Sequence, residues 1–230
     1  MFPYGYGLDA GYIWVLIAMG ISMLTSFWVN STFKRYEKVP SNLTGAQAAR
    51  YVLDKNGLYK VQIVHIAGNL TDNYNPTTKI LSLSDSTYNS RSVAAVGVAC
   101  HEVGHAIQDA KDYLPNRIRA NLVPVVNIGS TAALPLFLLG LLLDITGLIW
   151  LGIILFFLSL LFGLVTLPVE FNASYRALQT LKTDPHFDQK DYDGAKQVLL
   201  AAASTYVASV FVSLAQLVRY IGLANRNNRS

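Results

Sequence analysis

The sequence predicts a mainly α-helical integral membrane protein with a small α+β region and three or four transmembrane helices. Charged residues make up 14% of the 230 residues and hydrophobic residues 52%, with a mean hydropathy of +0.34. Ordinary globular proteins carry roughly 25% charged residues. Four long stretches of the chain contain no charged residue. Because about 20 apolar residues suffice to cross a bilayer, we expect the lipid bilayer to be a partner of this chain.

The uncharged stretches define the expected membrane helices, which we place at residues 11–30, 120–143, 146–167 and 197–222. The second stretch contains Pro124 and Pro135, which predict a kink in that helix. The fourth is rich in alanine and serine. It therefore fits either a fourth span or a long helix packed against the other three.

Basic residues beside the spans predict their orientation. Lysine and arginine follow the first span at 34–38, and none precedes it. The positive-inside rule therefore places the N-terminus outside and the next segment in the cytoplasm. The loop around Asp144 lacks basic residues, which fits an outside location. We expect residues 34–119 and 168–196 to be cytoplasmic, whereas Arg226 and Arg229 conflict with this orientation if the fourth helix spans.

The charge and cysteine content exclude two further classes. A net charge of +4 is explained by the basic residues beside the spans, so we expect no nucleic-acid partner. Cys100 is the only cysteine, which excludes an internal disulfide. We interpret it as a small core residue. The pattern indicates no particular oligomeric state.

The polar block at 34–119 predicts a helix, two strands and a second helix. Thr44 and Gln47 form a capping-box pattern at the start of the first helix, and Gly57 marks its end. The stretches LYKVQIVHI and KILSLS read as strands on either side of a turn-rich segment. The second helix, capped by Asn89 or Ser90, runs through SVAAVGVACHEVGHAIQDAKDY and stops before a proline.

That second helix carries His101, Glu102 and His105 in an H-E-x-x-H pattern. Residues four apart lie on one face of a helix, so both imidazoles can reach one zinc ion. Glu102 is the next residue along the helix after His101, and its carboxylate can take a proton from a water beside the metal. Gly104 leaves this side of the helix thin, so another element can pack close.

A catalytic zinc normally has three protein ligands, and Glu170 is the best candidate for the third. Two membrane crossings separate it from His105, which returns its carboxylate to the same membrane face. The alternative is that Glu170 is a helix-start charge after Pro168. His65 lies in a predicted strand and reads as a packed or surface imidazole, and His186 lies in a polar loop.

HEVGH, a two-span hairpin and the sequence EFNAS together resemble the membrane zinc metallopeptidases of the gluzincin type. The chain is most similar to the YugP-type putative neutral zinc metallopeptidases of bacteria, over nearly its whole length. The resemblance implies a zincin-like fold for the α+β region. It implies Zn²⁺ as cofactor, His101, His105 and Glu170 as its ligands and Glu102 as general base. It also implies a bacterial plasma membrane location.

The resemblance also concerns residues around the ligands. The residue four after the third ligand is commonly Asp in gluzincins, whereas here it is Ser174, which can still accept an imidazole N–H. Asn172 is a rival for this supporting role. By analogy, the strand at 79–84 is placed to receive a substrate as an added strand. Candidates for stabilising an oxyanion, by chemistry alone, are Tyr74, His186 and Arg176.

The leading hypothesis is a membrane-embedded zinc endopeptidase that cleaves membrane or membrane-proximal proteins or peptides, with its active site facing the cytoplasm. The alternative is a non-proteolytic membrane protein that uses the zinc site for folding or assembly. An ion transporter is disfavoured because the spans contain almost no charged residue to form an ion path. Prenyl-protein processing is disfavoured because the short chain leaves little room for a large chamber in the membrane.

Overall fold

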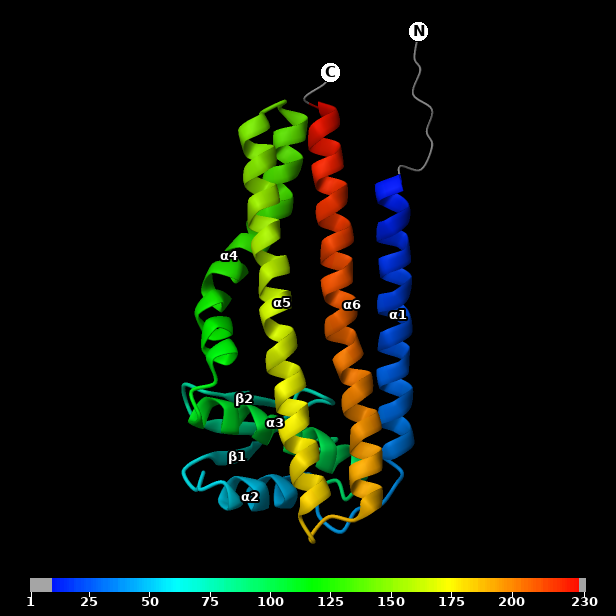
Figure 1. The fold of residues 1–230 in the computed structure, drawn as a ribbon, viewed down its shortest axis with the longest axis vertical. Coiled ribbons are helices and arrows are strands. Elements are labelled where there is room, and N and C mark those ends of the chain that lie inside the picture. Colours follow the sequence, from blue (N-terminus) through cyan, green and yellow to red (C-terminus); the bar gives the residue numbers. More distant parts are fainter. Residues whose placement is uncertain (1–9, 228–230) are drawn as a thin grey trace. The chain divides into compact units, whose positions relative to one another are not determined.

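The computed structural model describes residues 10–227. Within them the elements follow in the order α1, α2, β1, β2, β3, α3, α4, α5 and α6 (Figure 1). The chain divides into two compact units. The site unit consists of Ser26–Ile118 and Thr166–Thr205, and the helical unit contains the remaining described residues. The expected mainly α-helical membrane protein with a small α+β region is confirmed.

Four helices are long and apolar enough to cross a membrane: α1 (Ala10–Tyr36), α4 (Leu114–Leu142), α5 (Thr146–Thr183) and α6 (Gln189–Asn227). Large apolar side chains on them are exposed, among them Met23, Ile128 and Leu142. Water disfavours such surfaces, whereas lipid covers them without cost. The fourth segment thus meets the same criteria of length and composition as the other three.

Prolines and glycines shape the α4–α5 hairpin of the helical unit. Pro124 and Pro135 both lie inside the continuous α4 helix, which bends along its length (Figure 1). A Cβ atom on Gly140 would lie 2.5 Å from the backbone nitrogen of Ile149, and one on Gly152 would lie 2.7 Å from the carbonyl oxygen of Ala133. The two helices can therefore approach this closely only because both positions are glycine.

Both helices of the α+β region begin at capping side chains. The helix α2 (Gly45–Lys55) has the predicted capping box between Thr44 and Gln47, and Gly57 follows it with a φ of 73°. The helix α3 (Val93–Ala110) begins at Ser92, so the predicted caps Asn89 and Ser90 are wrong. Ser92 has an extended backbone because it bridges to Pro40, and its hydroxyl accepts the N–H of Ala95.

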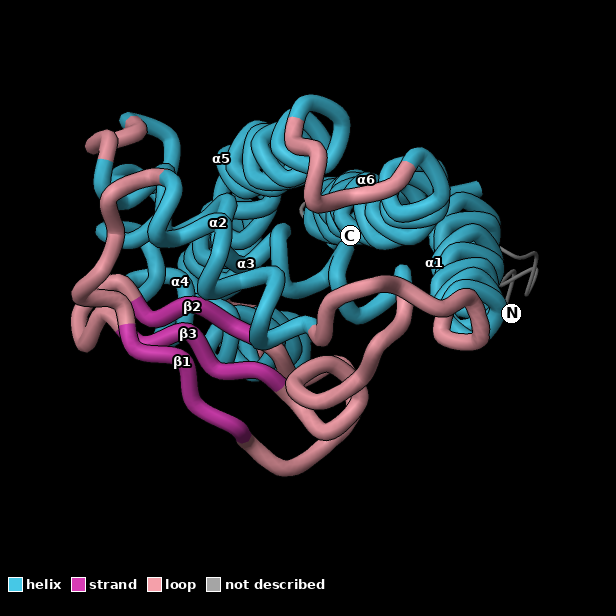
Figure 2. The backbone as a smooth tube through the Cα atoms, turned by 90° about the horizontal axis from the view of Figure 1, so that it is seen from below, coloured by secondary structure: helices cyan, strands magenta, loops and turns pink. Residues whose placement is uncertain are grey.

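The three strands form one sheet in the order β1-β3-β2 (Figure 2). The strand β1 (Gln62–His65) pairs parallel with β3 (Ile80–Leu83), and β2 (Asn73–Asn75) pairs antiparallel with β3. The segment expected only as turns therefore contains β2, a polar Asn-Tyr-Asn strand without hydrophobic alternation. Because β3 is paired on both sides, it has no free edge, and the expectation that the strand at 79–84 receives a substrate is wrong.

The core of the site unit lies among α2, α3, the sheet and the parts of α5 and α6 that belong to this unit. Leu53, Leu81, Leu83 and Val103 are fully buried in it. Cys100 belongs to the same cluster, where burial raises the pKa of its thiol to about 12. These contacts fix α3 on the sheet and leave another of its faces for α5.

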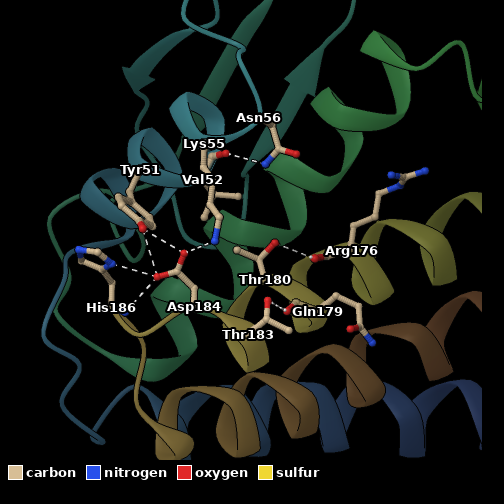
Figure 3. Close-up of polar contacts among 10 residues, drawn as sticks. All are labelled: Tyr51, Val52, Lys55, Asn56, Arg176, Gln179, Thr180, Thr183, Asp184 and His186. Carbon is tan, nitrogen blue, oxygen red and sulfur yellow. Dashed lines mark hydrogen bonds and ion pairs between the residues drawn. The ribbon is translucent and has the colours of Figure 1, made fainter.

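A buried carboxylate connects α2 to the end of α5 (Figure 3). Asp184 follows α5 directly, and both of its oxygens are within 3.1 Å of the Tyr51 hydroxyl. It also pairs with Lys55 and accepts the backbone N–H and the ring N–H of His186. This Asp184 cluster satisfies a carboxylate that would be costly to bury alone.

Candidate metal site

Small residues bring α3 and α5 together at the H-E-x-x-H pattern. A Cβ atom on Gly104 would lie 2.5 Å from the carbonyl oxygen of Ala173 on α5. No side chain fits that gap, so the close approach of the two helices requires glycine at this position. The thin helix face inferred from the sequence is therefore the face that meets α5.

Glu170 lies inside α5, which continues through Pro168 to Thr183. The alternative that Glu170 is a helix-start charge after Pro168 is therefore wrong. The carboxylate is almost completely buried, at 3% exposure. Its Oε2 atom lies 3.2 Å from Nε2 of His101 and 3.5 Å from Nε2 of His105.

The distances from the Glu170 oxygen to the two histidine nitrogens have the spacing that a tetrahedral zinc site needs. Ligand atoms about 2.1 Å from a tetrahedral ion lie about 3.4 Å from one another. The two distances from Glu170 to the histidine nitrogens, 3.2 and 3.5 Å, agree with that value. Two imidazoles and one carboxylate are also a donor set that zinc uses in catalytic sites. The residues therefore fit the metal.

Glu102 completes the group at the site. The side-chain ligand atoms of His101, Glu102 and His105 all lie within 4.8 Å of one another, so these three residues could also hold a metal. Glu102 is only partly buried, whereas Glu170 is enclosed. A more exposed carboxylate next to the donors is better placed to exchange protons than to act as a fixed ligand.

A polar side chain contacts Nδ1 of each histidine ring, the nitrogen that does not face Glu170. The Ser174 hydroxyl lies 3.1 Å from Nδ1 of His101, and Oε1 of Gln108 lies 3.1 Å from Nδ1 of His105. The predicted supporting residue Asn172 contacts Gln108 rather than a histidine. Gln108 is fully buried and was missed from the sequence, although its position three residues after His105 puts it on the adjoining helix face.

Two carboxylates influence the protonation of His105. Burial disfavours its charged form, but the hydrogen bond with Glu170 and the nearby charge of Glu102 outweigh that effect and raise its pKa. A metal ion that binds Nε2 of His105 would have to displace the proton that this nitrogen carries when the imidazole is charged.

The other sequence candidates have partners of their own. The hydroxyl of Tyr74 donates to Asp109. Burial is the main cause that raises the pKa of Tyr74, and the hydrogen bond with Asp109 raises it further. His186 belongs to the Asp184 cluster, and Nε of Arg176 donates to the amide oxygen of Asn172. The partners named here, Asp109, Asp184 and Asn172, are not among the donor residues of the candidate metal site. His65 is a surface imidazole that pairs with Asp85, as its strand position suggested.

Comparisons with known proteins show the family to which this chain belongs. The model of a family described as "putative neutral zinc metallopeptidase" matches residues 11–225. A protein of Bacillus subtilis (strain 168) described as "putative membrane protease YugP" is 46% identical over 208 residues, which cover 90% of this chain and 92% of that protein. No solved structure matches the chain. Because the family model covers most of the chain, the protein belongs to the putative neutral zinc metallopeptidase family.

Proposed function

We propose that this protein is a zinc-dependent endopeptidase of the membrane that hydrolyses peptide bonds of membrane or membrane-proximal proteins. The observation that carries the proposal is the convergence of two imidazole nitrogens on one buried carboxylate oxygen, at 3.2 and 3.5 Å. A second, more exposed carboxylate adjoins them. A structural zinc site would need no such free carboxylate.

His101, His105 and Glu170 would hold the zinc ion. When bound there, zinc would polarise a substrate carbonyl and acidify a water molecule. Glu102 acts as general base: its carboxylate takes one proton from the attacking water while the new carbon–oxygen bond forms. The same carboxyl group then gives that proton to the peptide nitrogen as the carbon–nitrogen bond breaks, which releases a neutral amine.

The substrate would lie along the face of α3 that bears Glu102. Positions four and seven residues further on share this face, and they are Ala106 and Asp109. Both line a groove of about 360 Å³ with Leu58 and Tyr74. The strand β2, which carries Tyr74 and pairs only with β3 in the described sheet, offers the backbone edge nearest to α3.

The membrane location rests on the four apolar helices and on the name of the Bacillus subtilis relative, a putative membrane protease. We place the site on the cytoplasmic side of a bacterial plasma membrane, because the basic residues at 34–38 follow the first span.

The test compares wild type with Glu102→Gln, which keeps the shape of the side chain but cannot take a proton. Detergent-purified protein would be incubated with unfolded model proteins and with bacterial membranes, and new peptide termini counted by mass spectrometry. We expect wild type to create termini, and Glu102→Gln to lose at least ~100-fold of this activity with full zinc content. Retained activity in Glu102→Gln would overturn the mechanism. Zinc-dependent folding with no cleavage by wild type would support the non-proteolytic role.

A further inference from the structure

The fully buried amide of Gln108 connects the metal-facing histidine His105 to α5. Its Nε2 atom donates to the carbonyl oxygen of Val169 at 2.7 Å and to Oδ1 of Asn172 at 3.1 Å. Its Oε1 atom lies 3.1 Å from Nδ1 of His105. At the far end, Nε of Arg176 donates to the same Oδ1 atom of Asn172 at 2.7 Å.

The chemistry of the partners fixes which group donates in each hydrogen bond of this series. A backbone carbonyl can only accept, so Gln108 must turn its NH₂ group toward Val169 and its oxygen toward His105. A guanidinium can only donate, so Asn172 must present its oxygen to Arg176 and therefore also to the Gln108 amide. Two independent anchors thus give Gln108 the same orientation.

We propose that Gln108, held by Val169, Asn172 and Arg176, is a positioning residue that fixes His105 as the tautomer protonated on Nδ1. Because the Gln108 oxygen carries no proton, the hydrogen between the two side chains must come from the ring. The free electron pair of His105 then lies on Nε2, the atom that faces Glu170 at 3.5 Å. The consequence for zinc binding rests on the proposed function.

The second histidine is held differently. The Ser174 hydroxyl near Nδ1 of His101 can donate or accept, so it fits either tautomer of that ring. The site therefore combines one imidazole of fixed tautomer with one that can adapt. Loss of the Gln108 amide should weaken zinc binding more than loss of the Ser174 hydroxyl.

The test replaces Gln108 by Met, which keeps the length of the side chain and removes its polar atoms. Gln179→Met is the matched control, because Gln179 is exposed on α5 and its backbone carbonyl, not its side chain, accepts the hydroxyl of Thr183. Zinc affinity would be measured by chelator competition. The Glu170 carboxylate, 3.5 Å from Nε2 of His105, would itself attract a proton to that atom while no metal is bound. The tautomer would therefore be read in zinc-free protein that carries Glu170→Ala, at alkaline pH, from the ¹⁵N chemical shifts of the four histidines.

In the Glu170→Ala background we expect neutral His105 to carry its proton on Nδ1, with or without Gln179→Met, and to become a mixture of tautomers when Gln108→Met is added. Zinc affinity should fall by about 10–100-fold in Gln108→Met and change little in the control. Arg176 lies at the more exposed end of this hydrogen-bond series, so Arg176→Met should reduce zinc affinity less than Gln108→Met does. Added to Gln108→Met, it should cause no further loss of affinity.

A His105 ring protonated on Nε2 in Glu170→Ala would overturn the proposal, as would an unchanged tautomer and affinity after Gln108→Met. If Gln108→Met does not fold, the tautomer in Glu170→Ala and the zinc affinity of Arg176→Met still decide. Failure of wild type to bind zinc would instead contradict the proposed function, and the tautomer measurement in the zinc-free protein would remain valid.

Discussion

At the residue scale, a hydroxyl and an amide support the two histidines, and only part of this could be predicted. The spacing of His101, Glu102 and His105 is a local property of one helix, so the sequence predicts it directly. Gln108 acts through atoms of α5 that lie 61 and 64 residues later in the chain. No helical pattern encodes such a partner, which explains why the sequence did not reveal it.

Ser174→Asp should strengthen zinc binding. A carboxylate facing Nδ1 of His101 would accept its N–H bond more strongly than the hydroxyl does at 3.1 Å, and so raise the basicity of the ligand nitrogen. We expect a several-fold gain in chelator competition, and a loss of a few-fold at most for Ser174→Ala. Gln179→Asp adds the same charge at an exposed position and serves as the control. Weaker zinc binding in Ser174→Asp would contradict this explanation.

At the element scale, the distance between α3 and α5 sets the geometry of the site. The thin face at Gly104 and the capping box of α2 were predicted from the sequence, because both depend on residue size or on neighbours in the chain. The strand β2 was not predicted, because Asn73–Asn75 owes its conformation to pairing with β3 rather than to its own pattern.

Gly104→Ala should reduce both stability and zinc affinity. The added methyl group would meet the Ala173 carbonyl at 2.5 Å, so α3 and α5 must separate, and Glu170 moves away from the histidines. We expect a cost of about 1–3 kcal/mol, measured by chemical denaturation in detergent. Gly20→Ala is the control, because nothing lies within 4 Å of a Cβ atom there. Equal stability and zinc affinity in the two variants would refute this reading of the helix contact.

The Asp184 cluster should make the site unit sensitive to acid. Burial opposes ionisation of Asp184, but its bonds with Lys55, His186 and Tyr51 outweigh this and lower its pKa below the ordinary 3.8. A carboxyl group with a lowered folded-state pKa stabilises the fold above its unfolded pKa, and this stabilisation is lost as the pH falls below about 4.

Asp184→Asn keeps the shape of the side chain and cannot titrate. We expect its thermal midpoint to lie below that of wild type at neutral pH and to approach it as the pH falls toward about 3. The control Asp54→Asn disrupts an exposed pair with Arg50 and should change the midpoint little. A constant difference between Asp184→Asn and wild type across this pH range would be inconsistent with the lowered pKa.

At the scale of the whole molecule, the length of the uncharged stretches predicted the long helices. The even number of membrane crossings between His105 and Glu170 predicted that Glu170 returns toward the histidines. The structure places Glu170 next to both rings. What the sequence could not supply was the continuity of α5 through Pro168, because a proline after an apolar stretch equally predicts the start of a new helix. Neighbouring helices support a proline inside a membrane helix, and a single stretch of sequence does not show them.

The proposed orientation can be tested by labelling single cysteines in intact cells. The only native cysteine, Cys100, is buried, so background labelling should be low. We expect Ile145→Cys, in the loop between α4 and α5, to react with a membrane-impermeant maleimide, and Lys60→Cys to react only after permeabilisation. The reverse pattern would place the site outside the cytoplasm.

The most direct test of the central claim is the zinc content of the purified protein beside that of its Glu170→Ala variant. Glu37→Ala is the matched control, because Glu37 is an exposed glutamate far along the chain from the site. The three-ligand site predicts about one zinc per chain in wild type and in Glu37→Ala, and a large loss in Glu170→Ala. Equal zinc in all three proteins would exclude Glu170 as a ligand, and wild type without zinc would contradict the metallopeptidase mechanism itself.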